Sequence, residues 1–382
     1  MHRYLQNLLL VAASTIIGLL ILEALLWWKY PPPRYNPLPS GLVVSNSLGA
    51  LSLAPNFIET MDNRAEFRDK QVRSNAEGRR VVPASSKLLH GGIRLHLLGD
   101  SQTFGHGLSD DESWPNNLQM KLLEAGIPIR VENWGVPGAN VEHYWRRLPE
   151  LLKSASPGDT LLIGLTWNDF TTSPGNLDTL IRDPRIVDQS SPNDATQKPR
   201  KISGGPVLGV PQLTDAKTFL RILSKNSALI SAILPAIKAV HYQTREKHPI
   251  NEILASGVTG EVFKVLSEIQ KRAENSGIRF SVMLLTNGVF LVDQAYATFS
   301  QDGRFFPTQN VMGDITTPLC KAHKIHCIDA FNTLHVDGGT DAIYPLDGHY
   351  TPVSAQRIAS LLADQLAPLL IQPVSSANRA DK

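Results

Sequence analysis

Five short apolar segments, each followed by a polar turn, constrain the fold of this chain more than any other feature. They are IRLHLLG (93–99), IRVEN (129–133), DTLLIGLT (159–166), IRFSVMLLT (278–286) and KIHCIDAF (324–331). Helical patterns lie between or after them, at 109–126, 141–155, 258–276 and 352–368. Because short buried strands that alternate with helices form parallel sheets, the sequence predicts an α/β domain. We expect about five parallel strands with helices on both faces.

The helix expected at 109–126 has local start and stop signals. Ser109 and Glu112 have the spacing of a capping box, and Pro115 suits a first turn. Gly126 suits the end of the helix. The sequence therefore predicts a helix within 109–126 that Ser109 and Glu112 cap.

The N-terminal stretch from Leu8 to Trp28 is apolar, and Glu23 is its only charged residue. About 20 such residues cross a bilayer as a helix. Trp27, Trp28 and Tyr30 lie where an interfacial aromatic belt is found. A cleaved signal peptide has a shorter apolar core and a small-x-small site, so we predict an uncleaved membrane anchor. The alternative is a buried core helix. Basic residues flank the stretch on both sides and do not fix its orientation.

The sequence divides into four parts. We expect a membrane anchor at 1–30, a Pro-rich spacer and N-terminal extension at 31–90, a main domain at 91–372, and a flexible tail at 373–382. Residues 171–215 of the main domain are rich in Pro, Gly, Ser, Asp and Asn, and they form a variable insert. A helical stretch is expected at 216–245.

The composition narrows the class of protein. The 382 residues are 42% hydrophobic and 19% charged, with a net charge of +2, which is typical of a globular protein. No basic stripe or nucleic-acid motif is present, so we expect no nucleic-acid partner. Cys320 and Cys327 are too few for a disulfide scaffold, but they can pair if the domain is exported. The CKAHKIHC segment spans a helix end and a strand, which disfavours a metal site.

Residues with a candidate role in chemistry follow four of the five expected strands. They are Ser101 after the first, Gly138 in NWGVPGAN after the second, Asn168 in TWND after the third, and Asp347 and His349 in PLDGHYTP after the fifth. Ligands of open parallel sheets bind beyond the carboxyl ends of the strands. We therefore expect these residues to meet in one crevice. Each motif alone is also an ordinary turn, so the prediction depends on their combination.

This set of residues suits acyl transfer. A serine hydroxyl is a weak nucleophile until a base removes its proton, and His349 can be that base. Asp347 is the candidate carboxylate that orients the imidazole, because side chains at i and i+2 of an extended segment point to the same side. Asp337 and Asp341 are competing carboxylates on the same loop.

An oxyanion hole is also expected. The backbone N–H of Ser101, the N–H of Gly138 and the side-chain amide of Asn168 are its candidate donors. Gly135 competes with Gly138 for the second position, and either glycine can simply permit a tight turn. We interpret Asp100 as a structural residue that accepts backbone hydrogen bonds. His106, His323 and His326 are interpreted as surface or satisfied histidines.

The blocks GDSQTFGHG, NWGVPGAN, WND and DGH resemble the ordered sequence blocks of the SGNH (GDSL-type) hydrolases. The resemblance covers roughly residues 90–370. It implies a flavodoxin-like sheet and ester chemistry without a metal or other cofactor. It also implies that Ser101 is the nucleophile, that Gly138 and Asn168 complete the oxyanion hole, and that His349 is the base. The longer stretch GDSQTFGHGLSDDESWP resembles membrane-anchored members associated with envelope polysaccharide.

Two departures from the family pattern guide the choice of substrate. The acid and base are spaced Asp-x-His, where the family usually has Asp-x-x-His, and this shorter spacing resembles the polysaccharide O-acetyltransferase-like branch. Trp167 precedes Asn168 where a small residue is usual. Trp167 and Trp134 are therefore candidate substrate contacts, although aromatic side chains also serve in packing.

The sequence thus predicts an enzyme: a membrane-anchored esterase, or an O-acyl (O-acetyl) hydrolase or transferase. Its expected substrate is an acylated carbohydrate or another ester in the cell envelope. We expect the catalytic domain to lie in the periplasm or another extracytoplasmic space, where envelope-assembly proteins are candidate partners. The alternative is a non-catalytic carbohydrate-binding or assembly factor that retains the SGNH fold.

Overall fold

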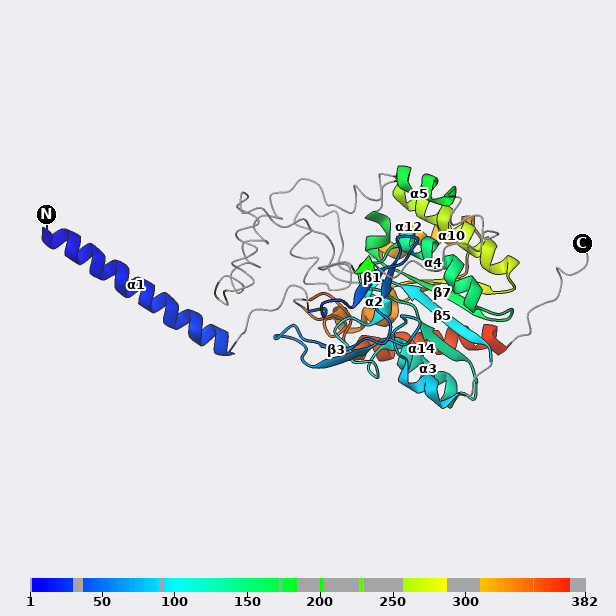
Figure 1. Ribbon diagram of the computed structural model, residues 1–382, viewed down its shortest axis with the longest axis horizontal. Coiled ribbons are helices and arrows are strands. Elements are labelled where there is room, and N and C mark those ends of the chain that lie inside the picture. Colours follow the sequence, from blue (N-terminus) through cyan, green and yellow to red (C-terminus); the bar gives the residue numbers. More distant parts are fainter. Residues whose placement is uncertain are drawn as a thin grey trace, which may run out of the picture.

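A computed structural model describes most of the main domain and the N-terminal helix (Figure 1). The described residues are 2–29, 37–88, 92–171, 174–183, 200–201, 227, 229, 257–286, 310–345 and 347–371. The spacer at 31–36, most of the insert at 171–215, the helix expected at 216–245 and the tail at 373–382 lie outside the described residues.

The centre of the fold is a five-stranded parallel sheet. Its strands are β5 (Arg94–Gly99), β6 (Arg130–Asn133), β7 (Thr160–Leu165), β9 (Arg279–Leu284) and β10 (Cys327–Asp329). Their order is β10-β9-β7-β5-β6, and all neighbouring strands are parallel. Read in chain order from the other edge, this is 2-1-3-4-5, the flavodoxin-like order. The predicted fold class is confirmed, and the order reverses between β5 and β7, where Ser101 and Asn168 follow neighbouring strands.

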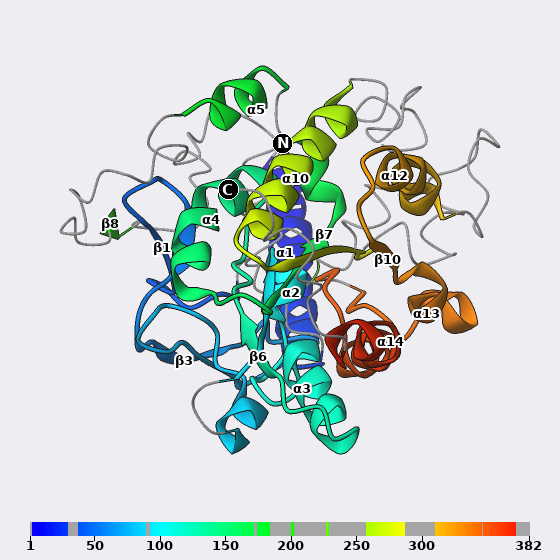
Figure 2. The same ribbon diagram turned by 90° about the vertical axis from the view of Figure 1, so that its right-hand side faces the viewer.

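Helices cover both faces of this sheet (Figure 2). On one side α3 (Trp114–Glu124) packs against α14 (Pro352–Ile371). On the other side α10 (Val258–Asn275) packs against α4 (Val141–Ser154), α5 (Pro174–Ile181) and α12 (Val311–Ala322). Strands β5, β7 and β9 are buried along nearly their whole length. Burial on both faces is typical of parallel sheets and explains their nearly continuous apolar sequences.

The start of α3 differs from the prediction. The side chain of Glu112 accepts a bond from the Ser109 amide at 2.8 Å, as in a capping box. However, residues 109–113 form a turn, and the helix begins at Trp114 with Ser113 at the N-cap position. Pro115 lies in the first helical turn as expected, because its missing N–H is not needed there.

The N-terminal extension consists of short elements that pack on the main domain. They are β1 (Val43–Ser45), β2 (Leu51–Leu53), β3 (Ile58–Met61), β4 (Lys70–Arg73) and the 3-10 helix η1 (Pro83–Lys87). β3 and β4 form an antiparallel hairpin, and β1 pairs with β2 and with β8 (Arg200–Lys201). A single bridge between Arg80 and Asn133 joins the extension to β6. The apolar side chains of the extension belong to the same core as the sheet.

Helix α1 (His2–Lys29) contains the apolar N-terminal stretch. Its segment Leu9–Lys29 has a mean hydropathy of 2.5 and is long enough to cross a membrane, and none of this window is buried. The alternative of a buried core helix is therefore wrong. A signal sequence passes the same test of length and apolarity.

Cys320 at the end of α12 and Cys327 at the start of β10 form a disulfide, with their Cα atoms 6.2 Å apart. The bond ties the outer strand of the sheet to the helix before it. Because both thiols are used in this bond, the CKAHKIHC segment does not offer a two-cysteine metal site.

Candidate active site

Ser101 is the first residue of α2 (Ser101–Phe104), a single helical turn that follows β5 directly. Asp100 is the N-cap of this turn, and its Oδ1 accepts a bond from the Gln102 amide at 2.8 Å. Gly105 ends the turn with φ +90°, in the left-handed region. This strand-to-helix turn presents the half-buried Ser101 at the carboxyl end of the sheet.

His349 bridges Ser101 and Asp347. Its Nε2 lies 2.8 Å from the Ser101 Oγ, and its Nδ1 lies 2.6 Å from Asp347 Oδ1. With Nδ1–H donating to the carboxylate, Nε2 is left to accept the Ser101 hydroxyl proton. Gly348, with φ +84°, allows the sharp turn between the two side chains. The competing Asp341 instead binds Arg357 at 2.7 and 2.8 Å.

The Asp347 carboxyl is held in its ionised form. Burial alone would raise its pKa, but contacts with His106 and His349 outweigh burial and lower the pKa well below the usual range. Its backbone N–H donates to Glu66 Oε2 at 2.9 Å, so the N-terminal extension supports the acid directly. The loop around it closes through two bonds, from the Tyr344 amide to the His349 carbonyl and from the Gly348 amide to the Tyr344 carbonyl.

His106 was not predicted as a site residue, but it lies against this group. Its ring stacks on the His349 ring with centroids 4.0 Å apart and planes 24° apart. Its Nε2 lies 3.5 Å from Asp347 Oδ2, and the side chain is only 5% exposed. The surface interpretation of His106 is therefore wrong. Flanking Gly105 and Gly107, both with positive φ, were the sequence signal that the chain turns inward here.

Asn168 lies beyond β7, the strand next to β5. Its Nδ2 donates to Asp100 Oδ2 at 3.1 Å, and its Oδ1 accepts from the Thr166 hydroxyl. The Thr166 hydroxyl also lies 2.8 Å from Asp100 Oδ2. An amide nitrogen carries two hydrogens, so these contacts orient the Asn168 amide next to the Ser101 turn. Asp100 is structural as expected, and one of its oxygens positions this candidate oxyanion donor.

The two glycines of NWGVPGAN differ in environment. A Cβ at Gly135 would lie 2.3 Å from the Phe104 backbone nitrogen, so this glycine permits close approach of the β6 loop to α2. Gly138 has φ +80° and is exposed, and a Cβ there would come no closer than 3.8 Å to its nearest neighbour, a methyl carbon of Leu51. Gly135 is therefore explained by packing, and Gly138 stays the candidate oxyanion donor.

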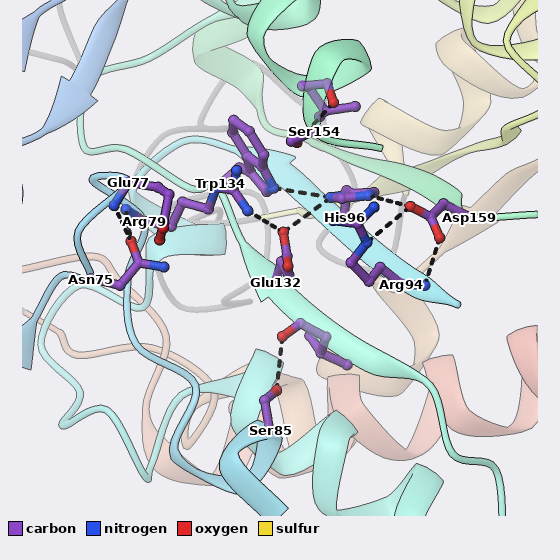
Figure 3. Close-up of polar contacts among 12 residues, drawn as sticks. Asn75, Glu77, Arg79, Ser85, Arg94, His96, Glu132, Trp134, Ser154 and Asp159 are labelled. Atoms are coloured by element: carbon purple, nitrogen blue, oxygen red, sulfur yellow. Dashed lines mark hydrogen bonds and ion pairs between the residues drawn. The ribbon is translucent and has the colours of Figure 1, made fainter. Parts of the chain in front are cut away.

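The two candidate substrate tryptophans separate clearly. Trp134 has no exposed surface: its ring lies between the guanidinium groups of Arg79 and Arg147, and its Nε1–H donates to His96 at 3.2 Å. Figure 3 shows it beside the buried His96, which also contacts Asp159 at 3.0 Å. The substrate-contact prediction for Trp134 is wrong. Trp167, next to Asn168, is 41% exposed and stays available for a ligand.

A buried arginine of the extension fastens the loop that carries His106. The Arg80 guanidinium donates to the carbonyls of Phe104, Gly105 and Leu108 at 2.5–2.7 Å, and to Asp110 at 3.1 Å. The side chain has no exposed surface. Sequence reasoning missed Arg80 and Glu66 because each acts on a loop far away in the chain.

His106, Asp347 and His349 bring ligand atoms within 4.8 Å of one another, which is close enough to hold a metal ion. An ion there would occupy one ring nitrogen of His349 and replace the bond that this nitrogen makes to Ser101 or to Asp347. The present arrangement therefore suits proton transfer from a hydroxyl.

Comparisons with known proteins found similarity to esterases and to a lipolytic protein. No family model matches the chain. An arylesterase of Vibrio mimicus is 38% identical over 76 residues, which are 20% of this chain and 38% of that relative's length. Among solved structures, an esterase, EstA, from Pseudoalteromonas sp. is 14% identical (TM-score 0.39, 74% of this chain and 100% of that one). A lipolytic protein of the G-D-S-L family from Veillonella parvula is 13% identical (TM-score 0.36, 72% and 99%). The chain thus spans little more than a third of the length of the curated relative that it matches.

Proposed function

We propose that this chain is a serine hydrolase of SGNH type that cleaves ester-linked acyl groups through a covalent acyl-enzyme. The observation that carries the proposal is the continuous chain of contacts from Ser101 Oγ through His349 to Asp347, at 2.8 and 2.6 Å. Nucleophile, base and orienting carboxylate within hydrogen-bond reach are the arrangement that activates a serine.

In the first step, Ser101 Oγ attacks the ester carbonyl carbon while His349 Nε2 takes the hydroxyl proton. Asp347 stabilises the resulting imidazolium because its carboxyl stays ionised throughout the neutral pH range. The tetrahedral intermediate then collapses, the alcohol leaves with the proton from His349, and the acyl group stays on Ser101. Water then attacks the acyl carbon while His349 takes its proton, and His349 returns this proton to Ser101 Oγ as the acid is released.

The developing oxyanion needs preorganised donors. We assign these to the Ser101 N–H, the Gly138 N–H and the Asn168 amide. The contacts of Asn168 with Asp100 and Thr166 support this role, because they fix the amide before the substrate arrives. Removing one such donor typically costs about 100- to 1000-fold in kcat.

We further propose an acylated carbohydrate of the cell envelope as the substrate, with acetyl the favoured acyl group. The exposed ring of Trp167 beside the oxyanion hole supports this, because it narrows the acyl site and offers a flat face to a sugar. The proposed division of the chain is an anchor at 1–30, an extension at 31–90, a hydrolase domain at 91–372 and a tail at 373–382. Helix α1 would hold the catalytic domain at the membrane on the extracytoplasmic side, where envelope-assembly proteins are candidate partners.

A fluorophosphonate probe tests the activity, since it labels only activated serines. The full chain in detergent micelles should be labelled and should hydrolyse p-nitrophenyl acetate. Ser101→Ala should lose both, whereas Ser109→Ala, a neighbouring serine outside the proposed site, should keep both. An unlabelled wild-type protein that binds acetylated glycans would instead support the non-catalytic binding function.

Hydrolysis and transfer share the same acyl-enzyme and differ in the acceptor. With acetylated envelope glycan as donor, free acetate indicates hydrolysis, and acetyl groups on an added unacetylated glycan indicate transfer. Trp167→Ala should raise KM for the glycan donor while KM for p-nitrophenyl acetate changes little. Equal effects on both substrates would contradict the carbohydrate assignment.

A further inference from the structure

His106 is a buried titratable side chain that the mechanism above does not use. Both of its ring nitrogens are buried without a hydrogen bond among the described residues. Its Nε2 faces Asp347 Oδ2 at 3.5 Å, while the other oxygen of this carboxylate binds His349. The two imidazoles thus approach the two oxygens of one carboxylate, and their rings stack on each other.

The surroundings fix the position and the charge of His106. The edge-on ring of Phe67 has its centroid 5.9 Å from that of His106. Arg80 binds the carbonyls of Gly105 and Leu108, which lie on either side of His106 in the chain. The charged groups that act on it are Asp347, His349 and Arg80. Burial, reinforced by the charge of His349, lowers the pKa of His106 to about 4 despite Asp347, so its ring is neutral at pH 7.

A neutral imidazole has one N–H and one lone pair. Placing the lone pair toward Asp347 would set two acceptors against each other, so the hydrogen belongs on Nε2, where it points to Oδ2. The 3.5 Å separation is longer than an ordinary hydrogen bond, and catalytic hydrogen bonds commonly shorten when the substrate is bound. The neutral ring also offers its face to the imidazolium that His349 becomes during the reaction.

We propose that His106 is a positioning residue that holds the second oxygen of Asp347 and covers one face of the His349 ring. The carboxylate then cannot rotate away from Nδ1, and Nε2 stays on Ser101. This inference rests on the proposed function, since it concerns the same proton transfer. It adds a fourth side chain, contributed by the GHG segment, to the three that resemble the family pattern.

Three variants separate the donor from the ring. His106→Phe keeps a stacked ring without a donor, His106→Gln keeps a donor without the ring, and His106→Ala removes both. We expect His106→Phe to lower kcat about tenfold, as for loss of one charge-assisted hydrogen bond, with KM nearly unchanged. His106→Gln should recover most of this loss, and His106→Ala should show the largest loss. His143→Phe is the control, because His143 is a half-buried histidine outside the site whose pKa is also lowered to about 4.

The pH profile of kcat/KM is the readout that a merely structural role would not move. Without the His106 donor, the Asp347 carboxylate is free to rotate away from Nδ1 of His349, and the imidazolium form of this base loses part of its stabilising contact. The acid limb of the profile should therefore shift to lower pH in His106→Phe and stay in place in His143→Phe. Thermal unfolding of each variant in micelles shows whether it is folded.

The outcomes distinguish the two proposals. If wild-type protein is not labelled by the fluorophosphonate, the proposed function and this inference both fail. If the wild type is labelled and folded His106→Phe keeps its kcat and its acid limb, only the inference is overturned. The same holds if folded His106→Gln is as impaired as His106→Ala. If His106→Phe does not fold, the kcat and acid limb of His106→Gln decide: both near wild type support the inference, and a loss as large as that of His106→Ala overturns it.

Discussion

Removing the buried guanidinium of Arg80 should destabilise the loop at 104–110, which supports the candidate active site. Arg80→Met fits a side chain of similar length into the same space but removes the hydrogen bonds that Arg80 makes to four acceptors. Three are the carbonyls of Phe104, Gly105 and Leu108, and the fourth is a carboxylate oxygen of Asp110. Asp110 is itself only 2% exposed, so water does not easily replace the lost partner.

The magnitude follows from burial. Breaking a buried ion pair by removing one partner costs about 3–5 kcal/mol. Asp110 keeps its contacts with Arg73, but the three buried carbonyls lose their donor. We therefore expect the free energy of unfolding to fall by about 4 kcal/mol. Arg73 is the matched control, because it binds the same carboxylate at a shorter 2.7 Å but is 36% exposed. Exposed pairs contribute about 0–1 kcal/mol, so Arg73→Met should cost about 1 kcal/mol or less.

Urea unfolding of the full chain in micelles, followed by tryptophan fluorescence, measures both variants. Equal losses for Arg73→Met and Arg80→Met, or an Arg80→Met loss below about 1 kcal/mol, would refute the reasoning from burial.

Three further predictions concern other parts of the molecule. Gly135→Ala should cost more than about 2 kcal/mol because its Cβ meets the backbone of α2 at 2.3 Å, whereas Gly138→Ala should cost about 1 kcal/mol of strain, as measured by urea unfolding. Replacing Cys320 and Cys327 by serine should cost about 2 kcal/mol, since the disulfide closes a short loop, and a thermal midpoint equal to that of wild type would contradict this. In the folded protein His143 stays neutral down to pH about 4, whereas in the unfolded chain it takes up a proton near pH 6.5. The free energy of unfolding of the wild type therefore falls as the pH is lowered through this range. Between pH 6.5 and 5, this free energy should fall by about 2 kcal/mol less in His143→Phe than in the wild type.

The sheet was predictable from the sequence because each strand is a short apolar run with polar residues directly after it. The observed β7, Thr160–Leu165, lies inside the range expected at 159–166. The contact between Asp347 and His349 was also predicted, but it forms across the turn at Gly348, with φ +84°, and not along an extended segment. Such features depend on neighbours in the chain, and these are what a sequence displays.

Contacts between distant segments were not predictable in this way. Glu66 reaches the Asp347 amide across 281 positions, and Arg80 reaches the Leu108 carbonyl across 28. No spacing rule relates such pairs, because tertiary packing alone brings them together. Trp134 was misread for the same reason: its place after a strand is compatible with a ligand contact, but Arg79 and Arg147 enclose its ring from elsewhere in the fold.

Asp100 shows that a turn residue and a functional residue need not be alternative interpretations. A helix of one turn needs an acceptor for its first amides, and Asp100 Oδ1 supplies this to Gln102. Its Oδ2 then accepts from the Asn168 amide on the neighbouring strand end, and the Thr166 hydroxyl lies 2.8 Å from the same oxygen. Because the sheet order places β7 beside β5, the carboxylate that caps the Ser101 turn also orients the candidate oxyanion donor. The local requirement of the turn and the chemistry of the site therefore depend on the same side chain.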